Sequence, residues 1–286
     1  MCTVNKLIVE IGVSRSGTTF LSNVLAAHPA VVKNMLVKYV FRHGHAWRNH
    51  DCLSAEDATP RIRRYVQRRF YDLLKKSGKE RLLVCVQANT LQLAFVNEIF
   101  PDCKIVHILR DGREVACSQE FEWTVHVSPP GRGPLNRMFD VPITDLPAYA
   151  WEYLASVWHR FSGATYRYSW GPKIKDWKKL KASLDRLEFC AVTWRECVIA
   201  ARRVGLTLPK DRYYEIRFED LIRRTDDVIP PLLEFLELPP AKEVDEFIHK
   251  QLDHSRAGHW LKEAAPERLD RIAPHIGCLC RELGYV

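Results

Sequence analysis

The sequence contains no stretch that approaches about 18 uninterrupted apolar residues, the length that a membrane-spanning helix needs. Its N-terminal segment, MCTVNKLIVEIG, lacks an apolar run of signal-peptide shape behind a basic head. We therefore expect a soluble, unexported protein that works in the cytoplasm, without stable insertion into a membrane.

The nine cysteines are an odd number without the regular pairing of a disulfide framework. Free thiols pack as small hydrophobic groups where they fall in apolar segments, as four of them do here: Cys85, Cys103, Cys117 and Cys190. Cys278 and Cys280 form a CxC with no second pair at metal-ligand spacing. We therefore predict core thiols in a reducing compartment and no metal site.

A chain of 286 residues, 47% hydrophobic, is long enough to bury one large core, so we expect a single domain over residues 1–286. The formal net charge of +8 is not concentrated in a tail. Its densest stretches, RIRRYVQRR from Arg61 and the lysines from Lys173 to Lys181, are typical of exposed helix faces. The charge suits a nucleotide cosubstrate, which carries several negative charges, without requiring nucleic acid as a partner.

Short apolar segments alternate with segments of helical periodicity. Strands are predicted at Lys6–Gly12, Leu82–Gln87, Lys104–Leu109 and Tyr213–Phe218. Helices are predicted at Gly17–Ala27, near Leu91–Ile99, from Gly112, at Val228–Leu236, from Ala241 and at Pro266–Leu283. This order predicts an α/β fold, a P-loop-type parallel sheet flanked by helices.

Between about residues 119 and 212 the pattern changes to a loop, SPPGRGPLNRM, and then to aromatic-rich, mainly helical sequence. We interpret this region as an insertion that builds the acceptor side of a cleft, since long excursions from an α/β core often carry function. For each single tryptophan in this region, packing in the core is the simpler interpretation than contact with the substrate.

The first motif, Gly12-Val13-Ser14-Arg15-Ser16-Gly17-Thr18-Thr19, lacks a lysine where the Walker pattern GxxxxGK[ST] has one, because Thr18 occupies that position. It follows a strand and opens a helix, where backbone amides converge and the helix dipole is positive. A phosphate site without the lysine that reaches a γ-phosphate favours a donor held by amides, hydroxyls and Arg15.

The second motif, ILRDGREVACS, runs from Ile108 to Ser118, again from a strand end into a helix. Arg110 is predicted at the carboxyl edge of its strand, where ligands of open parallel sheets bind, and Ser118 about two turns into the helix. A guanidinium and a hydroxyl together suit a second phosphate, whereas a local ion pair or helix cap is the simpler alternative for Arg110-Asp111.

With these motifs the sequence resembles the sulfotransferases that use 3′-phosphoadenosine 5′-phosphosulfate (PAPS), especially the bacterial and protein-tyrosine branches. The resemblance includes the loop with its following His28-Pro29, the second motif, YYEIRFEDLI, and SRAGHW from Ser255. It implies that Arg15, Ser16, Gly17, Thr18 and Thr19 bind the 5′-phosphosulfate, Arg110 and Ser118 the 3′-phosphate, and that the stretch containing Ser255 and Gly258 closes over the nucleotide. It also implies sulfuryl transfer without a metal to a hydroxyl of a small-molecule or glycan acceptor: a carbohydrate, glycolipid or small metabolite.

The residues that supply a base in such relatives are absent. Lys33-Asn34-Met35-Leu36-Val37 stands where the protein-tyrosine branch has a glutamate, and Gln87, Ala88 and Asn89 stand where the cytosolic branch has a histidine. Histidine suits proton transfer at neutral pH, so we predict His43 and His45 as the catalytic base, with Arg15 stabilising developing charge. The other candidates are His50, Asp51, Glu120 and Glu122.

Two alternatives remain open at this point. A P-loop kinase needs a cation at position 18 and a Mg²⁺ carboxylate after a strand, and the sequence offers neither. A non-catalytic relative that binds nucleotide or nucleic acid would keep the anion sites without a base. The sequence pattern does not predict the oligomeric state.

Overall fold

A computed structural model describes residues 6–34, 38–125, 142–151, 154 and 171–285. A five-stranded sheet lies at its centre in the order β2-β3-β1-β4-β5. Every neighbouring pair is parallel. The strands are β1 (Leu7–Ile11), β2 (Val31–Asn34), β3 (Arg81–Cys85), β4 (Lys104–Leu109) and β5 (Tyr213–Arg217). The predicted parallel α/β fold is therefore confirmed.

The strand order places the topological switch point of the sheet between β1 and β4. These two strands are neighbours, with Val9 beside Ile105 in register, but the chain leaves β1 toward β2 on one side of the sheet and leaves β4 toward β5 on the other. Connections that diverge from adjacent parallel strands open a crevice at their carboxyl ends, where open α/β sheets bind ligands. The two predicted anion motifs begin at these two strand ends.

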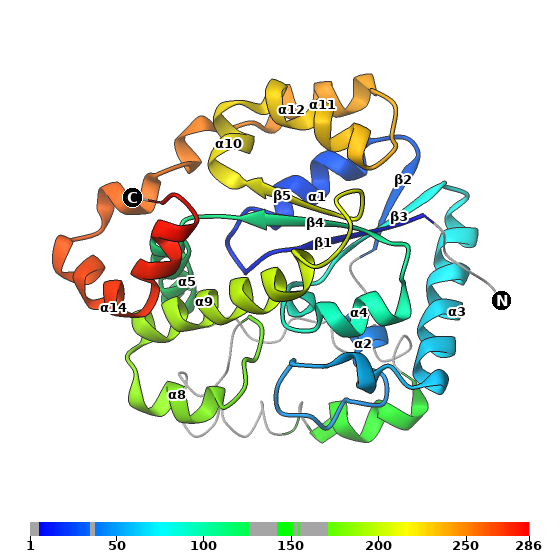
Figure 1. Cartoon of the computed structure of the whole chain (residues 1–286), viewed down its shortest axis with the longest axis horizontal. Helices are drawn as coiled ribbons and strands as arrows, with labels where there is room; N and C mark the ends of the chain where they lie inside the picture. Colours follow the sequence, from blue (N-terminus) through cyan, green and yellow to red (C-terminus); the bar gives the residue numbers. More distant parts are fainter. Residues whose placement is uncertain (1–5, 35–37, 126–141, 152–153, 155–170, 286) are drawn as a thin grey trace.

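Helices cover both faces of the sheet (Figure 1). On one face lie α1, α11 and α12, and on the other α3, α4 and α9, while α5 and α14 lie near the carboxyl ends of the strands. The helices of the described residues are α1 (Thr18–Ala27), α2 (Lys38–Phe41), α3 (Pro60–Ser77), α4 (Leu93–Ile99), α5 (Gly112–Val125), α8 (Trp177–Ser183), α9 (Arg186–Gly205), α10 (Phe218–Arg223), α11 (Thr225–Phe235), α12 (Lys242–Gln251), α13 (His259–Glu263) and α14 (Pro266–Glu282).

Alternation along β1 explains the two cores at the sheet. Leu7, Val9 and Ile11 pack toward α3 and α4, whereas Ile8 packs toward α1. Successive strand residues point to opposite faces, so a strand covered on both sides is apolar almost throughout. Glu10 is the exception in β1, because it is fully buried on the α1 face. A third core joins α5, α9 and α14 below the site.

The middle region is only partly described. The loop SPPGRGPLNRM, Trp158 and Trp170 lie outside the described residues. Trp194 on α9 is fully buried, and a Cβ added to Gly112 would lie 2.6 Å from its ring, which ties α9 to the start of α5. The expectation that the lysines up to Lys181 are all exposed is wrong for Lys181, which is 8% exposed because its ammonium lies 5.0 Å from the ring centre of Trp123.

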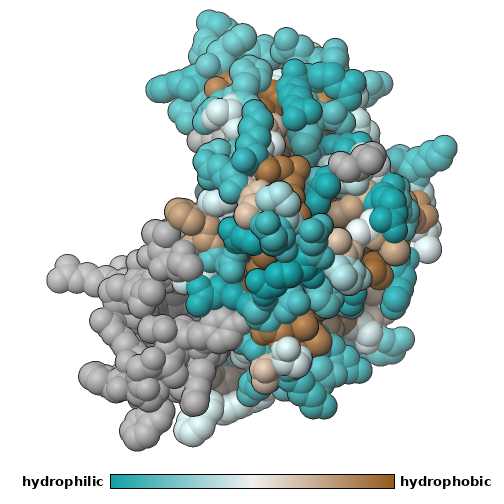
Figure 2. Space-filling model, turned by 90° about the vertical axis from the view of Figure 1, so that its left-hand side faces the viewer, coloured by the Kyte–Doolittle hydropathy of each residue, from teal (hydrophilic) through white to brown (hydrophobic). Residues whose placement is uncertain are grey.

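None of the helices in the described part of the chain combines the length and apolar character that crossing a bilayer requires. Viewed from the end at which the strands finish, the surface is mainly hydrophilic with small, scattered hydrophobic areas (Figure 2). This end carries the loops of the candidate site.

Candidate functional site

The loop between β1 and α1 has a backbone that only certain residues allow. Arg15 has φ 73° and Gly17 has φ 94°, both in the left-handed region. A Cβ at Gly17 would come within 2.2 Å of the ring of Phe218, so the position requires glycine for space as well as for conformation. The helix that follows has no side-chain cap and no acidic residue in its first turn. Its first amides and the positive end of its dipole are therefore suited to an anion.

The hydroxyls of the loop differ in their surroundings. Ser16 Oγ is buried and has no hydrogen-bond partner among the described residues, which fits a ligand oxygen at this position. Thr18 is buried and Thr19 is exposed. Ser14 Oγ instead donates to Gln87 Oε1 at 2.5 Å, and Gln119 Nε2 donates to the Ser14 carbonyl at 2.9 Å. These two glutamines, which sequence reasoning did not select, fix the loop against the end of β3 and against α5.

Arg110 lies at the end of β4 and is held from three sides. Its guanidinium donates to the Arg15 carbonyl at 2.9 Å and pairs with Glu114 at 2.7 Å. The guanidinium also lies 4.5 Å from the ring centre of Phe218. Its own carbonyl accepts a hydrogen bond from Trp194 Nε1 at 3.2 Å. The arginine of the second motif is thus buried and in contact with the backbone of the first motif.

Arg15 and Ser118, 103 positions apart in sequence, meet in the structure. Arg15 Nε donates to Ser118 Oγ at 3.0 Å. The same guanidinium forms an ion pair with Glu122 at 2.9 Å, one turn further along α5. The structure therefore brings together Arg15, Arg110 and Ser118 from the two motifs, and adds Glu122, which the sequence offered only as one of several candidate bases.

The terminal stretch reaches α5 through its backbone. Leu261 N, in α13, donates to Glu114 Oε1 at 2.8 Å, and the rings of Trp260 and Phe121 are 5.0 Å apart. Gly258 starts α13 with φ 84°. Ser255 is exposed, and its hydroxyl donates to Asp253 at 2.6 Å. Among the contacts of the described residues, none joins Ser255 or Gly258 to Arg110 or Ser118.

The two predicted histidines have partners of their own. His43 is buried, with Nδ1 2.8 Å from Asp145 Oδ2 and its ring 4.0 Å from that of Tyr65. His45 Nε2 lies 3.1 Å from the carbonyl of Asp57. No contact between these histidines and the loop occurs within the described part of the chain.

A buried acid lies under the first turns of α1. The carboxyl of Glu10 is fully buried, and its polar neighbours are the Cys85 thiol and the Lys33 ammonium. Burial raises the pKa of Glu10 well above its usual value, while the Lys33 ammonium and the Cys85 thiol lower it in part. Glu10 is therefore suited to the neutral, protonated form, which burial favours.

Comparisons with known proteins agree with this geometry. Residues 8–166, more than half of the chain, match the model of the sulfotransferase family. No curated protein matches the sequence.

Solved structures share the fold at low sequence identity. The sulfotransferase domain from the curacin biosynthetic pathway has a TM-score of 0.54 at 15% identity, over 94% of this chain and 96% of that one. The sulfotransferase domain of the Synechococcus PCC 7002 olefin synthase gives 0.52 at 17% identity, over 95% and 94% of the two chains. Sulfotransferase STF9 from Mycobacterium avium gives 0.53 at 13% identity, over 98% and 77%. At these identities the structures establish a shared fold, and the family match establishes kinship: the chain belongs to the sulfotransferase family.

Proposed function

We propose that this protein is an enzyme that transfers a sulfuryl group from PAPS to a hydroxyl of a carbohydrate, glycolipid or small metabolite. The observation that carries the proposal is the meeting of the two anion motifs, Arg15 Nε with Ser118 Oγ at 3.0 Å and Arg110 with the Arg15 carbonyl at 2.9 Å. A nucleotide with phosphates at both its 5′ and 3′ positions needs two such anion sites close together.

The residues present fit this donor. The uncapped start of α1 and the unpartnered, buried Ser16 hydroxyl suit the 5′-phosphosulfate. Arg110 and Ser118 suit the 3′-phosphate, since a buried guanidinium makes strong hydrogen bonds to phosphate oxygens. When bound, PAPS supplies the activated sulfuryl group, and Arg15 with the loop amides is suited to stabilise charge on the oxygen that leaves.

The acceptor has to lose its proton, and two assignments of the base compete. His43 and His45 are the sequence-based candidates. Glu122 is the candidate that geometry favours, because its pairing with Arg15 places a carboxylate beside the loop. Replacing His43 and His45 separately by Asn tests the first assignment: full turnover in both variants would remove it.

We further propose that the chain forms one domain in which the region of about residues 119–212 supplies the acceptor side. Glu122 belongs to this region, as does Gly171, where an added Cβ would lie 3.3 Å from Ser14 Oγ. Glu122 and Gly171 thus lie next to the loop between β1 and α1, which supports an acceptor side built from this region. The acceptor would approach the donor from this side.

The first experiment is a calorimetric titration with 3′-phosphoadenosine 5′-phosphate, the desulfated product, with ATP and GTP plus magnesium as controls. It requires no knowledge of the acceptor. Tight binding of the bisphosphate alone supports the proposal. Preference for a magnesium triphosphate would instead favour the kinase alternative, which Thr18 argues against.

A further inference from the structure

Every arginine of the two anion motifs is already matched by a carboxylate. The pairs are Arg15 with Glu122 at 2.9 Å, Arg110 with Glu114 at 2.7 Å and Arg113 with Asp111 at 2.7 Å. These pairs add no net charge to the donor site, whereas a nucleotide with phosphates at both its 5′ and 3′ positions carries several negative charges. A further cation without a carboxylate partner would therefore strengthen binding of such a nucleotide.

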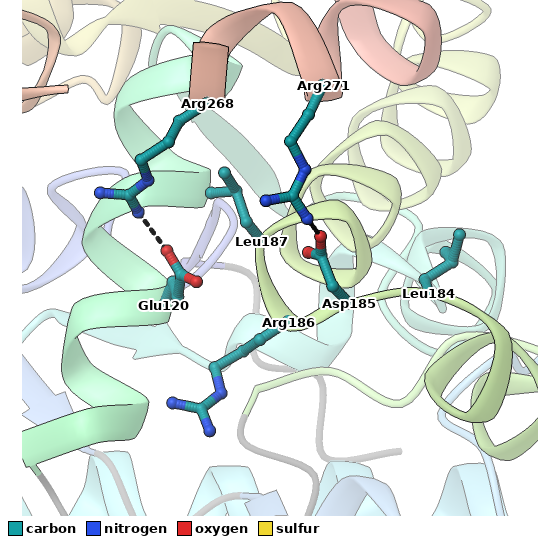
Figure 3. Close-up of a pocket in the computed structure, with 7 residues that line it drawn as sticks. All are labelled: Glu120, Leu184, Asp185, Arg186, Leu187, Arg268 and Arg271. Atoms are coloured by element: carbon teal, nitrogen blue, oxygen red, sulfur yellow. Dashed lines mark hydrogen bonds and ion pairs between the residues drawn. The ribbon is translucent and has the colours of Figure 1, made fainter. Parts of the chain in front are cut away.

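The arginines that α14 presents to α5 and α9 do not supply this cation. In the hollow between these three helices, Arg268 pairs with Glu120, and Arg271 pairs with Asp185 (Figure 3). Ser118, which contacts the donor loop, and Glu120 are two positions apart on α5, so their side chains point about 200° apart around the helix. The hollow thus lies on the side of α5 that faces away from the loop.

Arg223 is an arginine near the second motif whose charge is not matched. It is the last residue of α10, and it is exposed. Among the residues that the structure describes, its side chain takes part in neither an ion pair nor a hydrogen bond. The next residue, Arg224, differs in this respect because it pairs with Asp220 at 2.9 Å. The guanidinium of Arg223 is therefore available to a ligand.

The helix that carries Arg223 packs against the second motif. At its start, the ring centre of Phe218 lies 4.5 Å from the Arg110 guanidinium. One residue later, Glu219 Oε1 accepts a hydrogen bond from the Asp111 amide at 3.0 Å. Glu219 and Arg223 are four positions apart, so they lie on the same face of α10. Arg223 thus extends the face of α10 that contacts the second motif.

A short segment of the terminal stretch connects Arg223 to the partner of Arg110. A Cβ added to Gly258 would lie 3.8 Å from Arg223 Nη2, which places the guanidinium beside the start of α13. Three residues further on, the Leu261 amide donates to Glu114 Oε1 at 2.8 Å, and Glu114 pairs with Arg110. Three residues of a helix advance only about 4.5 Å. Arg223 and the pair of Arg110 with Glu114 therefore flank the same short segment.

We propose that Arg223 is a further binding residue for the donor and that it contacts the 3′-phosphate together with Arg110 and Ser118. This inference rests on the proposed function, because its ligand is the bisphosphate nucleotide. A guanidinium binds phosphate oxygens through paired hydrogen bonds, and Arg223 has no carboxylate partner that the phosphate would have to replace. Arg223 then gives the donor site a net positive charge and favours nucleotides that carry a 3′-phosphate.

The test is a calorimetric titration of the full chain with 3′-phosphoadenosine 5′-phosphate and, separately, with adenosine 5′-phosphate, which lacks the 3′-phosphate. Arg223→Gln should weaken binding of the bisphosphate roughly tenfold or more and change the affinity for adenosine 5′-phosphate by less than about twofold. Arg223→Lys keeps the charge and should bind the bisphosphate more tightly than Arg223→Gln does. Arg224→Gln is the matched control, because Arg224 is the adjacent exposed arginine and pairs with Asp220.

The outcomes separate this inference from the proposed function. Equal affinity of wild type and Arg223→Gln for the bisphosphate would overturn the role of Arg223 and leave the proposed function standing. Equal losses for both nucleotides, or an equal loss in Arg224→Gln, would also overturn it, since the effect would then not depend on the 3′-phosphate or on this side chain. Failure of wild type to bind the bisphosphate would instead refute the proposed function, and this inference with it. Thermal unfolding of each variant checks that it is folded.

Discussion

The buried carboxyl of Glu10 makes the stability of this protein depend on pH in a defined direction. The pKa is raised in the folded state, chiefly by burial, above the usual 4.5 that we take for the unfolded chain. As the pH rises through 4.5, the unfolded chain releases its proton first, and the folded chain retains it. The contribution of the protonated Glu10 carboxyl to the free energy of unfolding is thus fully present below about pH 4.5, and it is lost as the pH rises through the folded pKa.

The magnitude follows from linkage. Between the two pKa values the folded state holds one proton more than the unfolded chain. The free energy of unfolding therefore falls by about 1.4 kcal/mol for each unit by which the pH rises. Glu10→Gln removes the ionisable group at nearly constant volume. We therefore expect the difference in unfolding free energy between variant and wild type to grow in favour of the variant by about that slope.

The assay is urea unfolding of both proteins at intervals from about pH 4 to about pH 8. This range begins below the usual pKa of a glutamate and extends into the region where only the folded chain retains the proton. Glu234→Gln is the control, because Glu234 is exposed on α11 and should leave the slope unchanged. Parallel pH profiles for wild type and Glu10→Gln would refute the reasoning, since they would mean that Glu10 titrates alike in the folded and unfolded chain.

Three further outcomes are expected at the loop site. Arg110→Gln should weaken binding of the bisphosphate nucleotide by about 1.5–3 kcal/mol, measured by calorimetry, and unchanged affinity would contradict the 3′-phosphate assignment. Glu122→Gln should lower kcat roughly 10²-fold or more in a sulfuryl-transfer assay with the donor saturating, whereas full activity would exclude Glu122 as the base. Gly17→Ala should lower the midpoint of thermal unfolding more than Gly78→Ala, because both have positive φ but a Cβ at Gly78 meets nothing within 4 Å; equal shifts would mean that the contact with Phe218 costs nothing.

The elements with a continuous apolar run or a clear helical periodicity were predicted well from the sequence. Strand β4 has the predicted bounds, Lys104–Leu109, because six residues of mainly apolar character end at a turn on one side and at Arg110 on the other. Strand β2 was not predicted: it has four residues, Val31–Asn34, and only two are apolar. Helix α11 begins at Thr225, three residues before the predicted start, since Asp226 and Asp227 in its first turn belong to no apolar periodicity.

The site was predictable where a motif coincides with a strand end. Arg15, Arg110 and Ser118 were selected for that reason, and the parallel order of β1 and β4 brings them together. Gln87 and Gln119 carry no such signal, because an amide becomes a support for the loop only through tertiary packing. The burial of Lys181 was likewise hidden, since a run of lysines is typical of a solvated helix face.

Glu114 links parts of the chain that are far apart in sequence. One carboxylate pairs with Arg110, which holds the carbonyl of Arg15, and also accepts from the amide of Leu261. These hydrogen bonds connect residue 15 to residue 261 through the side chains of Arg110, just after β4, and Glu114, in the first turn of α5. A partly folded chain would lack one end of this connection. Nucleotide binding should therefore report complete folding, and it can serve as a sensitive criterion for correctly assembled protein during purification.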